Sequence, residues 1–404
     1  MRPEIGFKDF TKDWEQRKLA DVAQFSKGNG YSKADLTESG TPIILYGRLY
    51  TKYETRISNV DTFAEAKTDS VYSKGGEVIV PASGETAEDI ARAAAVENAG
   101  VLLGGDLNVI TPNDDINSEF LALSISNGAT QRELAKKAQG KSVVHIHNED
   151  IRNLVISFPN IEEQKNIAEQ IFNLDYLINL YHRKYKRFVN IKKSMLTKMF
   201  PQEGSKVPEI RFKGFTDDWE QRKLGEIIQE RTVRTSDFDN NPLYSLTIEN
   251  GITPKTDRYE RSSLVTKTED LFKVVKPNEF VTNPMNLRFG ALGYNTNTFS
   301  VSVSGYYDVF SIDDDRCSGF WNSYFKTSTA MKIFDNAATG SLIEKRRVKY
   351  STLQQLNFYM PRELSEKIKI GRYMDTLDHL ITLHQREIKK LQDVKKALLN
   401  KMFV

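Results

Sequence analysis

One forty-residue stretch occurs twice in this chain, and it limits what the rest can fold into. Residues 161–200 align without a gap with residues 364–403, and fifteen of the forty positions are identical. Both copies end in Lys-Met-Phe, and neither contains proline. Because nothing in them blocks backbone hydrogen bonding, each copy predicts a continuous helix about 60 Å long.

Apolar side chains recur in both copies at alternating spacings of four and three residues. They are Ile167, Ile171, Leu174, Ile178, Tyr181, Tyr185 and Phe188 in the first copy, and Ile370, Met374, Leu377, Ile381, His384, Ile388 and Leu391 in the second. This spacing predicts a helix that packs lengthwise on another helix. We expect the two copies to pair antiparallel, with Leu174, Ile178, Leu377 and Ile381 in the seam.

A second repeat precedes each globular segment. Residues 7–19 read FKDFTKDWEQRKL and residues 212–224 read FKGFTDDWEQRKL. Trp14 and Trp219 are retained in both leaders, and we interpret them as anchors against a helix or core; base stacking is the alternative. Residues 26–158 and 231–360 show no evident identity, so the frame is duplicated while the inserts differ.

The pattern predicts a mixed α/β fold: two α/β domains separated by two long antiparallel coiled-coil helices, with pseudo-two-fold symmetry. The expected segments are a first domain with its leader (1–158), a central helix (159–203), a second domain with its leader (204–361) and a distal helix (362–404). Apolar tracts predict strands at 42–46, 77–81, 101–103, 107–110, 154–158, 243–248, 280–283, 299–303 and 307–312, and helices at 117–127 and 131–138.

Composition excludes several classes of protein. A single cysteine, Cys317, leaves no pair for an internal disulfide and no Cys-rich zinc site. The N-terminal residues have no apolar core of the kind a signal peptide needs, and no run of about 18 apolar residues occurs. The single cysteine fits a reducing cytoplasm, and a charged content of 27% beside 39% hydrophobic residues indicates a globular protein with a mildly basic net charge of +3. We therefore expect a cytoplasmic globular protein.

Loops in both domains combine tyrosine, amide and basic residues with glycine or proline. Such side chains match base edges and phosphates, although ordinary solvated loops have a similar composition. The candidate DNA-binding residues are Lys27, Asn29, Tyr31, Arg48, Tyr50, Lys52, Lys141 and Ser142 in the first domain, and Arg258, Asn283, Asn286, Arg288, Tyr306, Arg346 and Arg347 in the second. Arg48 and Arg288 are the candidates for base readout, since each lies near glycine in a locally uncharged turn; Lys52 and Arg347 are the candidates for phosphate contacts.

The first long helix carries seven basic residues and no acid between residues 183 and 198. This run has two readings that the sequence leaves open. It is either a solvated helix face or a track along DNA phosphates.

Several motifs suggest catalysis and fail on inspection. Residues 241–244 read Asn-Pro-Leu-Tyr, which lacks the second proline of the adenine-methyltransferase motif. Residues 140–142 read Gly-Lys-Ser without the earlier glycine of a phosphate-binding loop. His145 and His147 have no third metal ligand in view, and Cys317 has no evident histidine partner. We therefore expect no catalytic, cofactor or metal site on this chain.

The combined pattern resembles the specificity subunit of type I restriction-modification enzymes. The resemblance rests on the duplicated WEQRKL leader, the variable segment, the helix entry at 159–165 (PNIEEQK) and the long Lys-Lys-x-x-L helix, and it covers essentially the whole chain. Residues 83–89 and 303–307 also look like stretches of target recognition domains. The second helix entry, at 361–367, has one extra residue, which leaves the start of that helix open.

The resemblance implies a division of labour. Each target recognition domain would read one half of a bipartite double-stranded DNA site, and the helices would set the spacer. Two modification subunits would bring S-adenosylmethionine and methylate adenine, while restriction subunits would bring ATP and Mg. Two alternatives stay open: a coiled-coil scaffold with two protein-binding domains, and a standalone methyltransferase with a degenerate motif.

Overall fold

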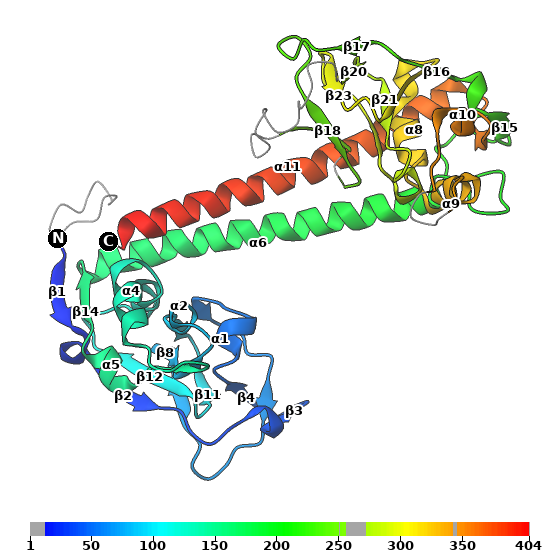
Figure 1. The fold of residues 1–404 in the computed structure, drawn as a ribbon. Helices are drawn as coiled ribbons and strands as arrows, with labels where there is room; N and C mark the ends of the chain where they lie inside the picture. Colours follow the sequence, from blue (N-terminus) through cyan, green and yellow to red (C-terminus); the bar gives the residue numbers. More distant parts are fainter. Residues whose placement is uncertain (1–12, 250, 256–271, 342–345, 404) are drawn as a thin grey trace. The chain divides into compact units, whose positions relative to one another are not determined.

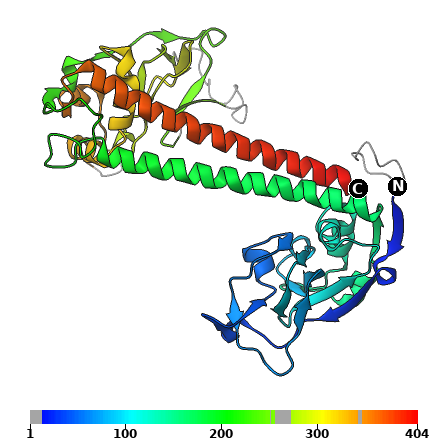
Figure 2. The ribbon, with the colours of Figure 1, turned by 180° about the vertical axis from the view of Figure 1, so that it is seen from behind.

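The computed structural model describes residues 13–249, 251–255, 272–341 and 346–403 (Figures 1 and 2). The chain divides into two compact units. The first contains residues up to 181 together with 387–404, and the second contains residues 182–386. Each unit therefore holds one globular domain and part of both long helices. Each long helix contributes to both units, and the four segments expected from the sequence stay a prediction.

The first unit contains two five-stranded sheets. Its elements are β1 (Glu15–Lys18), η1 (Leu19–Asp21), β2 (Ala23–Lys27), η2 (Lys33–Asp35), β3 (Leu36–Thr37), β4 (Thr41–Ile44), α1 (Arg48–Thr51), β5 (Arg56–Ile57), β6 (Phe63–Ala64), β7 (Tyr72–Lys74), β8 (Glu77–Pro81), β9 (Ser83–Gly84), α2 (Ala87–Ile90), β10 (Ala94–Val96), β11 (Ala99–Leu103), β12 (Leu107–Pro112), α3 (Ser118–Ile125), α4 (Gly128–Lys137), β13 (Val144–His145), α5 (Asn148–Arg152) and β14 (Val155–Phe158). The strand orders are β2-β12-β8-β10-β5 and β3-β6-β4-β11-β7.

The second unit contains smaller sheets. Its elements are β15 (Glu220–Lys223), η3 (Leu224–Glu226), β16 (Ile228–Glu230), β17 (Arg234–Thr235), β18 (Tyr244–Thr247), β19 (Gly251–Pro254), β20 (Phe272–Val275), β21 (Phe280–Thr282), η4 (Leu287–Phe289), β22 (Leu292–Tyr294), β23 (Val301–Val303), β24 (Asp308–Ile312), η5 (Asp315–Cys317), α8 (Ser318–Tyr324), α9 (Ser328–Ala337), α10 (Tyr350–Leu353) and β25 (Asn357–Met360). The strand orders are β16-β24-β21-β22, β17-β20-β23 and β18-β19.

The two domains share a fold although their sequences have diverged. The order β2-β12-β8-β10 reappears as β16-β24-β21-β22, with antiparallel pairing throughout. In each domain two helices follow the last long strand, α3 and α4 in one and α8 and α9 in the other. Asn117 caps α3 and Thr327 caps α9, each by accepting a backbone N–H with its side-chain oxygen. The inserts without evident identity are therefore also a repeat.

The repeated leader forms a strand that closes each domain. β1 pairs antiparallel with β14, and β15 pairs in the same way with β25. In both repeats the partner strand is the one that leads into the long helix. The tryptophan before each leader strand is buried, at 7% exposure for Trp14 and 2% for Trp219. The expectation that both tryptophans act as anchors is confirmed.

The long helices are α6 (Ile161–Lys198) and α11 (Leu364–Met402). They begin at equivalent residues of the repeat, so the extra residue in the second entry is absorbed before the helix. Asn160 caps α6 by accepting the backbone N–H groups of Glu162 and Glu163. All fourteen predicted seam positions are buried or half-buried: of the four singled out, Ile178 and Leu377 are buried, and Leu174 and Ile381 are half-buried.

Reciprocal ion pairs fix the register of these helices within each unit. Lys395 contacts both carboxylate oxygens of Asp175, at 2.6 and 2.7 Å, in the first unit. Lys192 pairs with Asp378 in the second. The two aspartates occupy equivalent positions of the repeat, as do the two lysines. In each unit an early part of one helix thus meets a late part of the other, which confirms antiparallel packing (Figures 1 and 2).

The phenylalanine at each identical Lys-Met-Phe end packs into a domain core. Phe403 ends the second repeat but packs on Phe120 of α3 in the first unit, with ring centroids 5.5 Å apart. Phe200 ends the first repeat and packs on Phe320 of α8 in the second unit, also at 5.5 Å and with the same 43° interplanar angle. Each helix therefore ends in the core of the domain that belongs to the other repeat.

The leader tryptophans complete both aromatic clusters. Trp14 lies 5.7 Å from Phe120, and Trp219 lies 5.9 Å from Phe320, measured between ring centroids. Each cluster joins a leader, a domain helix and the end of a long helix from the other copy. Three segments that are far apart in the sequence thus pack together in one aromatic cluster in each unit.

Phe403→Ala is expected to destabilise the first unit selectively. Truncating a buried phenylalanine costs about 3–5 kcal/mol, and the contact it loses is with α3. Hydrogen exchange should accelerate in α3 while α8 keeps its protection, and Phe200→Ala should give the reverse. Leu383→Ala, at a position of α11 that is 42% exposed, is the matched control and should change neither. Equal losses in both units would contradict this assignment.

Candidate nucleic-acid interface

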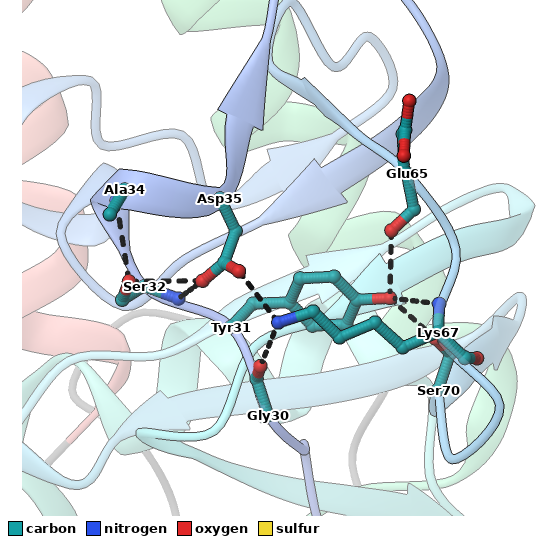
Figure 3. Close-up of polar contacts among 8 residues, drawn as sticks. All are labelled: Gly30, Tyr31, Ser32, Ala34, Asp35, Glu65, Lys67 and Ser70. Atoms are coloured by element: carbon teal, nitrogen blue, oxygen red, sulfur yellow. Dashed lines mark hydrogen bonds and ion pairs between the residues drawn. The ribbon is translucent and has the colours of Figure 1, made fainter.

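Tyr31 lies at the centre of a braced loop in the first domain (Figure 3). Its hydroxyl donates to the carbonyl of Glu65 at 3.2 Å and accepts the backbone N–H of Lys67 at 2.9 Å. The ammonium of Lys67 lies 4.6 Å from the centroid of the Tyr31 ring and pairs with Asp35 at 2.6 Å. The hydrogen bond from Lys67, followed by those from Ser32, lowers the pKa of Asp35 to about 2. Tyr31 therefore acts as a structural support for this loop.

The residues beside Tyr31 differ in how firmly they are held. The side chain of Asn29 donates to the carbonyl of Asp69 at 2.8 Å, whereas Lys27 is exposed at the end of β2. The backbone of Gly28 passes so close to the next turn that an added Cβ would lie 1.9 Å from the carbonyl oxygen of Gly104. Glycine is required there, and Lys27 stays a candidate for DNA contact.

Arg48 does not have the environment that the sequence suggested. Its side chain is only 7% exposed, and its guanidinium binds Asp61 at 2.5 Å and Glu54 at 2.8 Å. A third hydrogen bond reaches the carbonyl of Asn59 at 2.9 Å. The expected uncharged turn is wrong, because Glu54 and Asp61, six and thirteen residues further along the chain, both pair with Arg48. Base readout by Arg48 stays a prediction. Lys52 also pairs with Asp61, at 2.7 Å, but remains half exposed.

Tyr50 connects this region to the strand pair β9–β13. Its hydroxyl donates to the carbonyl of Ser83 at 2.8 Å, and burial raises its pKa. Ser83 belongs to β9, which pairs with β13, and the Ser83 hydroxyl lies 3.3 Å from Nδ1 of His145. Lys141 and Ser142 are exposed and lie in the turn between Gln139 and His145, which exchange backbone hydrogen bonds. These two residues stay candidates for contact with a nucleic acid.

The second domain brings its predicted residues closer together. The side chain of Asn283 accepts the backbone N–H of Met285, and the carbonyl of Asn286 accepts the backbone N–H of Phe289 at 2.9 Å. The backbone N–H of Val348 donates to the carbonyl of Pro284 at 2.9 Å, which ties the segment after Arg347 to this turn. Both asparagines are therefore placed in the turn itself, Asn283 by its side chain and Asn286 by its backbone.

Two of the predicted arginines, Arg288 and Arg346, contact α9. Arg288 pairs with Asp335 at 3.1 Å, and its side chain is only 11% exposed. The turn was expected to be uncharged, as for Arg48, because the acid that binds Arg288 lies far away in the sequence. Arg346 donates to the backbone carbonyl of Asp335 at 2.7 Å. The guanidinium of Arg347 lies 5.9 Å from the ring centroid of Tyr306, which is 43% exposed. Arg258 lies outside the described residues.

Sequence reasoning missed two residues that matter here. Lys67 braces the Tyr31 loop, but nothing in its local sequence marks it. Phe289 is 51% exposed beside Arg288, and an aromatic residue followed by Gly290 was the available signal.

Some residues of the basic run on α6 are exposed, and others are paired with acids. Arg183, Lys186, Arg187 and Lys193 are exposed, as a solvated or phosphate-facing surface requires. Lys192 instead pairs with Asp378, and Lys198 pairs with Glu209 at 2.7 Å. The run therefore supports both the helix packing and an exposed basic surface.

The structure also bears on the catalytic alternatives. Cys317 is buried, and this burial raises the pKa of its thiol to about 11, which disfavours the nucleophilic thiolate. Among the described residues, no group of three or more His, Cys, Asp or Glu side chains is placed to hold a metal ion. In the same ranges of the chain, no helix has the length and apolarity needed to cross a membrane.

Comparison with known families identifies the first repeat. Residues 11–187 match the family model of the type I restriction modification DNA specificity domain. This chain therefore contains a type I DNA specificity domain. The resemblance to specificity subunits that the repeats suggested is thereby confirmed.

Similarity to known proteins extends along the whole chain. A Methanocaldococcus jannaschii protein, named as a candidate specificity subunit of the type I restriction enzyme MjaX, is 22% identical over 99% of this chain and 94% of its own length. The MjaVIII specificity subunit of the same organism is 22% identical over 59% of this chain and 55% of its own length. The crystal structure of the type I restriction-modification system S subunit from M. genitalium has a TM-score of 0.64 at 13% identity, covering 100% of this chain and 99% of that chain, so the fold is shared.

Arg48→Ala is expected to destabilise the first domain and leave base preference unchanged. The substitution removes hydrogen bonds to two carboxylates and one carbonyl, and bonds to charged groups contribute about 1.5–3 kcal/mol each in favourable cases. The two carboxylates stay solvated in the variant, so we expect a total loss of about 2–3 kcal/mol. Urea unfolding measures this change. A variant of normal stability with altered base preference would restore Arg48 as a reading residue.

Proposed function

We propose that this chain is the DNA-recognition subunit of a type I restriction-modification complex and that each domain reads one half of a bipartite sequence. The observation that carries the proposal is a duplicated frame holding two different loop surfaces, one of them within the matched specificity domain. This combination suits a target with two unlike halves. The frame would place each domain on the DNA, and the loops of each domain would read the bases of its half-site.

The remaining activities belong to partner subunits in this proposal. Two modification subunits would dock on the duplicated frame and carry S-adenosylmethionine, and restriction subunits would carry ATP and Mg. The chain itself would bind no cofactor and catalyse nothing, and it would act in the cytoplasm where the DNA lies. Duplication supports a pair of modification subunits, since equivalent surfaces recur in both repeats.

The long helices would act as the ruler between the two half-sites. Half-sites read from one face of DNA lie about one helical turn apart, or multiples of it. The ion pairs Asp175–Lys395 and Asp378–Lys192 support this role because they oppose sliding of one helix along the other. The length of the helices would then determine the length of the spacer.

One observation favours the alternative of a protein-binding scaffold. Several candidate basic residues, including Arg48, Lys52 and Arg288, are paired with acids, and the net charge is only +3. The salt dependence of DNA binding distinguishes the two functions, since phosphate contacts impose a steep loss of affinity with rising salt. The assembled methyltransferase should bind a duplex carrying its site with such a loss; salt-independent binding, or none, would favour the scaffold.

Lys52→Ala is expected to weaken binding to all duplexes alike. Loss of one phosphate contact should flatten the slope of log affinity against log salt by about one unit, with no change in sequence preference. Lys136→Ala is the matched control, because Lys136 is also an exposed lysine paired with an acid, Glu133. A selective effect of Lys52→Ala on one half-site would refute the assignment to phosphate.

Shortening both helices by one heptad is expected to shorten the spacer and leave the half-sites unchanged. Deleting residues 181–187 and 384–390 removes equivalent segments and leaves both ion pairs and both aromatic ends in place. Seven residues correspond to about 10 Å, or roughly three base pairs. Sequencing methylated adenines in a host that carries the partner subunits measures the outcome. New half-sites with an unchanged spacer would show that the helices do not set the distance.

A further inference from the structure

Phe289 is displayed on the surface by a rigid turn. Its side chain is 51% exposed, although burial of a phenylalanine is normally favourable. The backbone N–H of Gly290 donates to the carbonyl of Leu287 at 2.8 Å, and Gly290 adopts a left-handed φ of 89° that favours glycine. The ring is therefore held outward by a turn with little freedom to collapse.

One face of the Phe289 ring is covered. The guanidinium carbon of Arg288 lies 4.4 Å from the ring centroid, within the range of a cation–π contact. Arg288 is in turn held by Asp335 on α9, at 3.1 Å. Phe289 remains 51% exposed beside this stack, and the cation–π contact favours one orientation of the ring.

The surroundings of Phe289 are charged and aromatic. Arg346 joins the same acid, with Nη1 3.7 Å from the Asp335 carboxylate. Arg347 and the exposed Tyr306 follow, and the Val348–Pro284 hydrogen bond connects them to the Phe289 turn. An apolar group among cations suits a ligand that offers phosphates beside a small apolar feature.

We propose that Phe289 contacts the C5-methyl group of a thymine in the half-site that the second domain reads, an inference that rests on the proposed function. The thymine methyl is the apolar group that a base pair presents in the major groove, and phenylalanine is among the side chains that contact it. Insertion between two stacked bases would need both faces of the ring, and Arg288 covers one.

Deoxyuridine substitution tests this contact, because it removes only the methyl group. Once methylome sequencing has defined the site, each thymine of both half-sites is replaced in turn, and binding of the assembled methyltransferase is measured. The native protein should lose about fourfold in affinity at one thymine of the second half-site, the effect of about one buried methyl group. Phe289→Ala should bind the thymine and deoxyuridine duplexes equally.

Phe299→Ala is the matched control. Phe299 is an exposed phenylalanine of the same domain, at 47% exposure, and lies outside the arginine cluster. This variant should keep the native response to deoxyuridine. Phe289→Leu, which preserves an apolar side chain, should keep part of it, and thermal melting confirms that each variant is folded.

Three outcomes would overturn the inference. They are a second half-site without thymine on either strand, a native protein insensitive to every deoxyuridine, and a Phe289→Ala variant with the native response. A rise in 2-aminopurine fluorescence that requires Phe289 would also overturn it, since that signal reports base unstacking. Failure of the proposed function looks different, because the native assembly would then recognise no bipartite site.

Discussion

The structure depends on an exchange of aromatic ends between the two repeats. Phe200 leaves the first repeat to pack on Phe320 of the second domain, and Phe403 leaves the second repeat to pack on Phe120 of the first. Both ends are buried, so each domain core is completed by residues from the other copy. This constraint explains why the Lys-Met-Phe ends are identical although the domains diverged. The antiparallel ion pairs agree with it, because a parallel pairing would carry each helix end away from the core it completes.

Sequence reasoning predicted the frame well because periodicity and identity report on it directly. The long helices, the leader tryptophans and most of the longer strands were visible from spacing and composition. The repetition of the sheets was not, since β2-β12-β8-β10 and β16-β24-β21-β22 share strand order without shared residues. Strand order depends on how the apolar faces of the strands pack together, and many different apolar side chains allow the same packing. The helix α8 was missed for a related reason: it is buried along its whole length and gives no amphipathic signal.

The candidate residues were chosen by residue type, and their role in DNA contact stays a prediction. Glycine, amide and basic residues marked turns that lie together in the second domain, where Arg288 and Arg346 both contact Asp335. Their partners were invisible, because Asp335 reaches Arg288 across forty-seven residues and Asp61 reaches Arg48 through the fold of a loop. A basic residue in a turn can read a base or brace the turn, and only the position of the nearest acid separates the two roles.

Paired basic residues affect how such a surface would recognise DNA under the proposed function. Arg48, Lys67 and Arg288 each form an ion pair with an aspartate, which lowers the local positive charge and stiffens the turn. A stiff turn loses little conformational entropy on binding, so its exposed groups contribute more fully to discrimination. A weakly charged surface also has a lower non-specific affinity for DNA. This part of the affinity comes from contacts between basic side chains and phosphates, and an ion pair with an acid weakens such contacts. Under the proposed function, the net charge of only +3 is therefore consistent with a subunit that supplies specificity, while the rest of the assembly supplies much of the attraction to DNA.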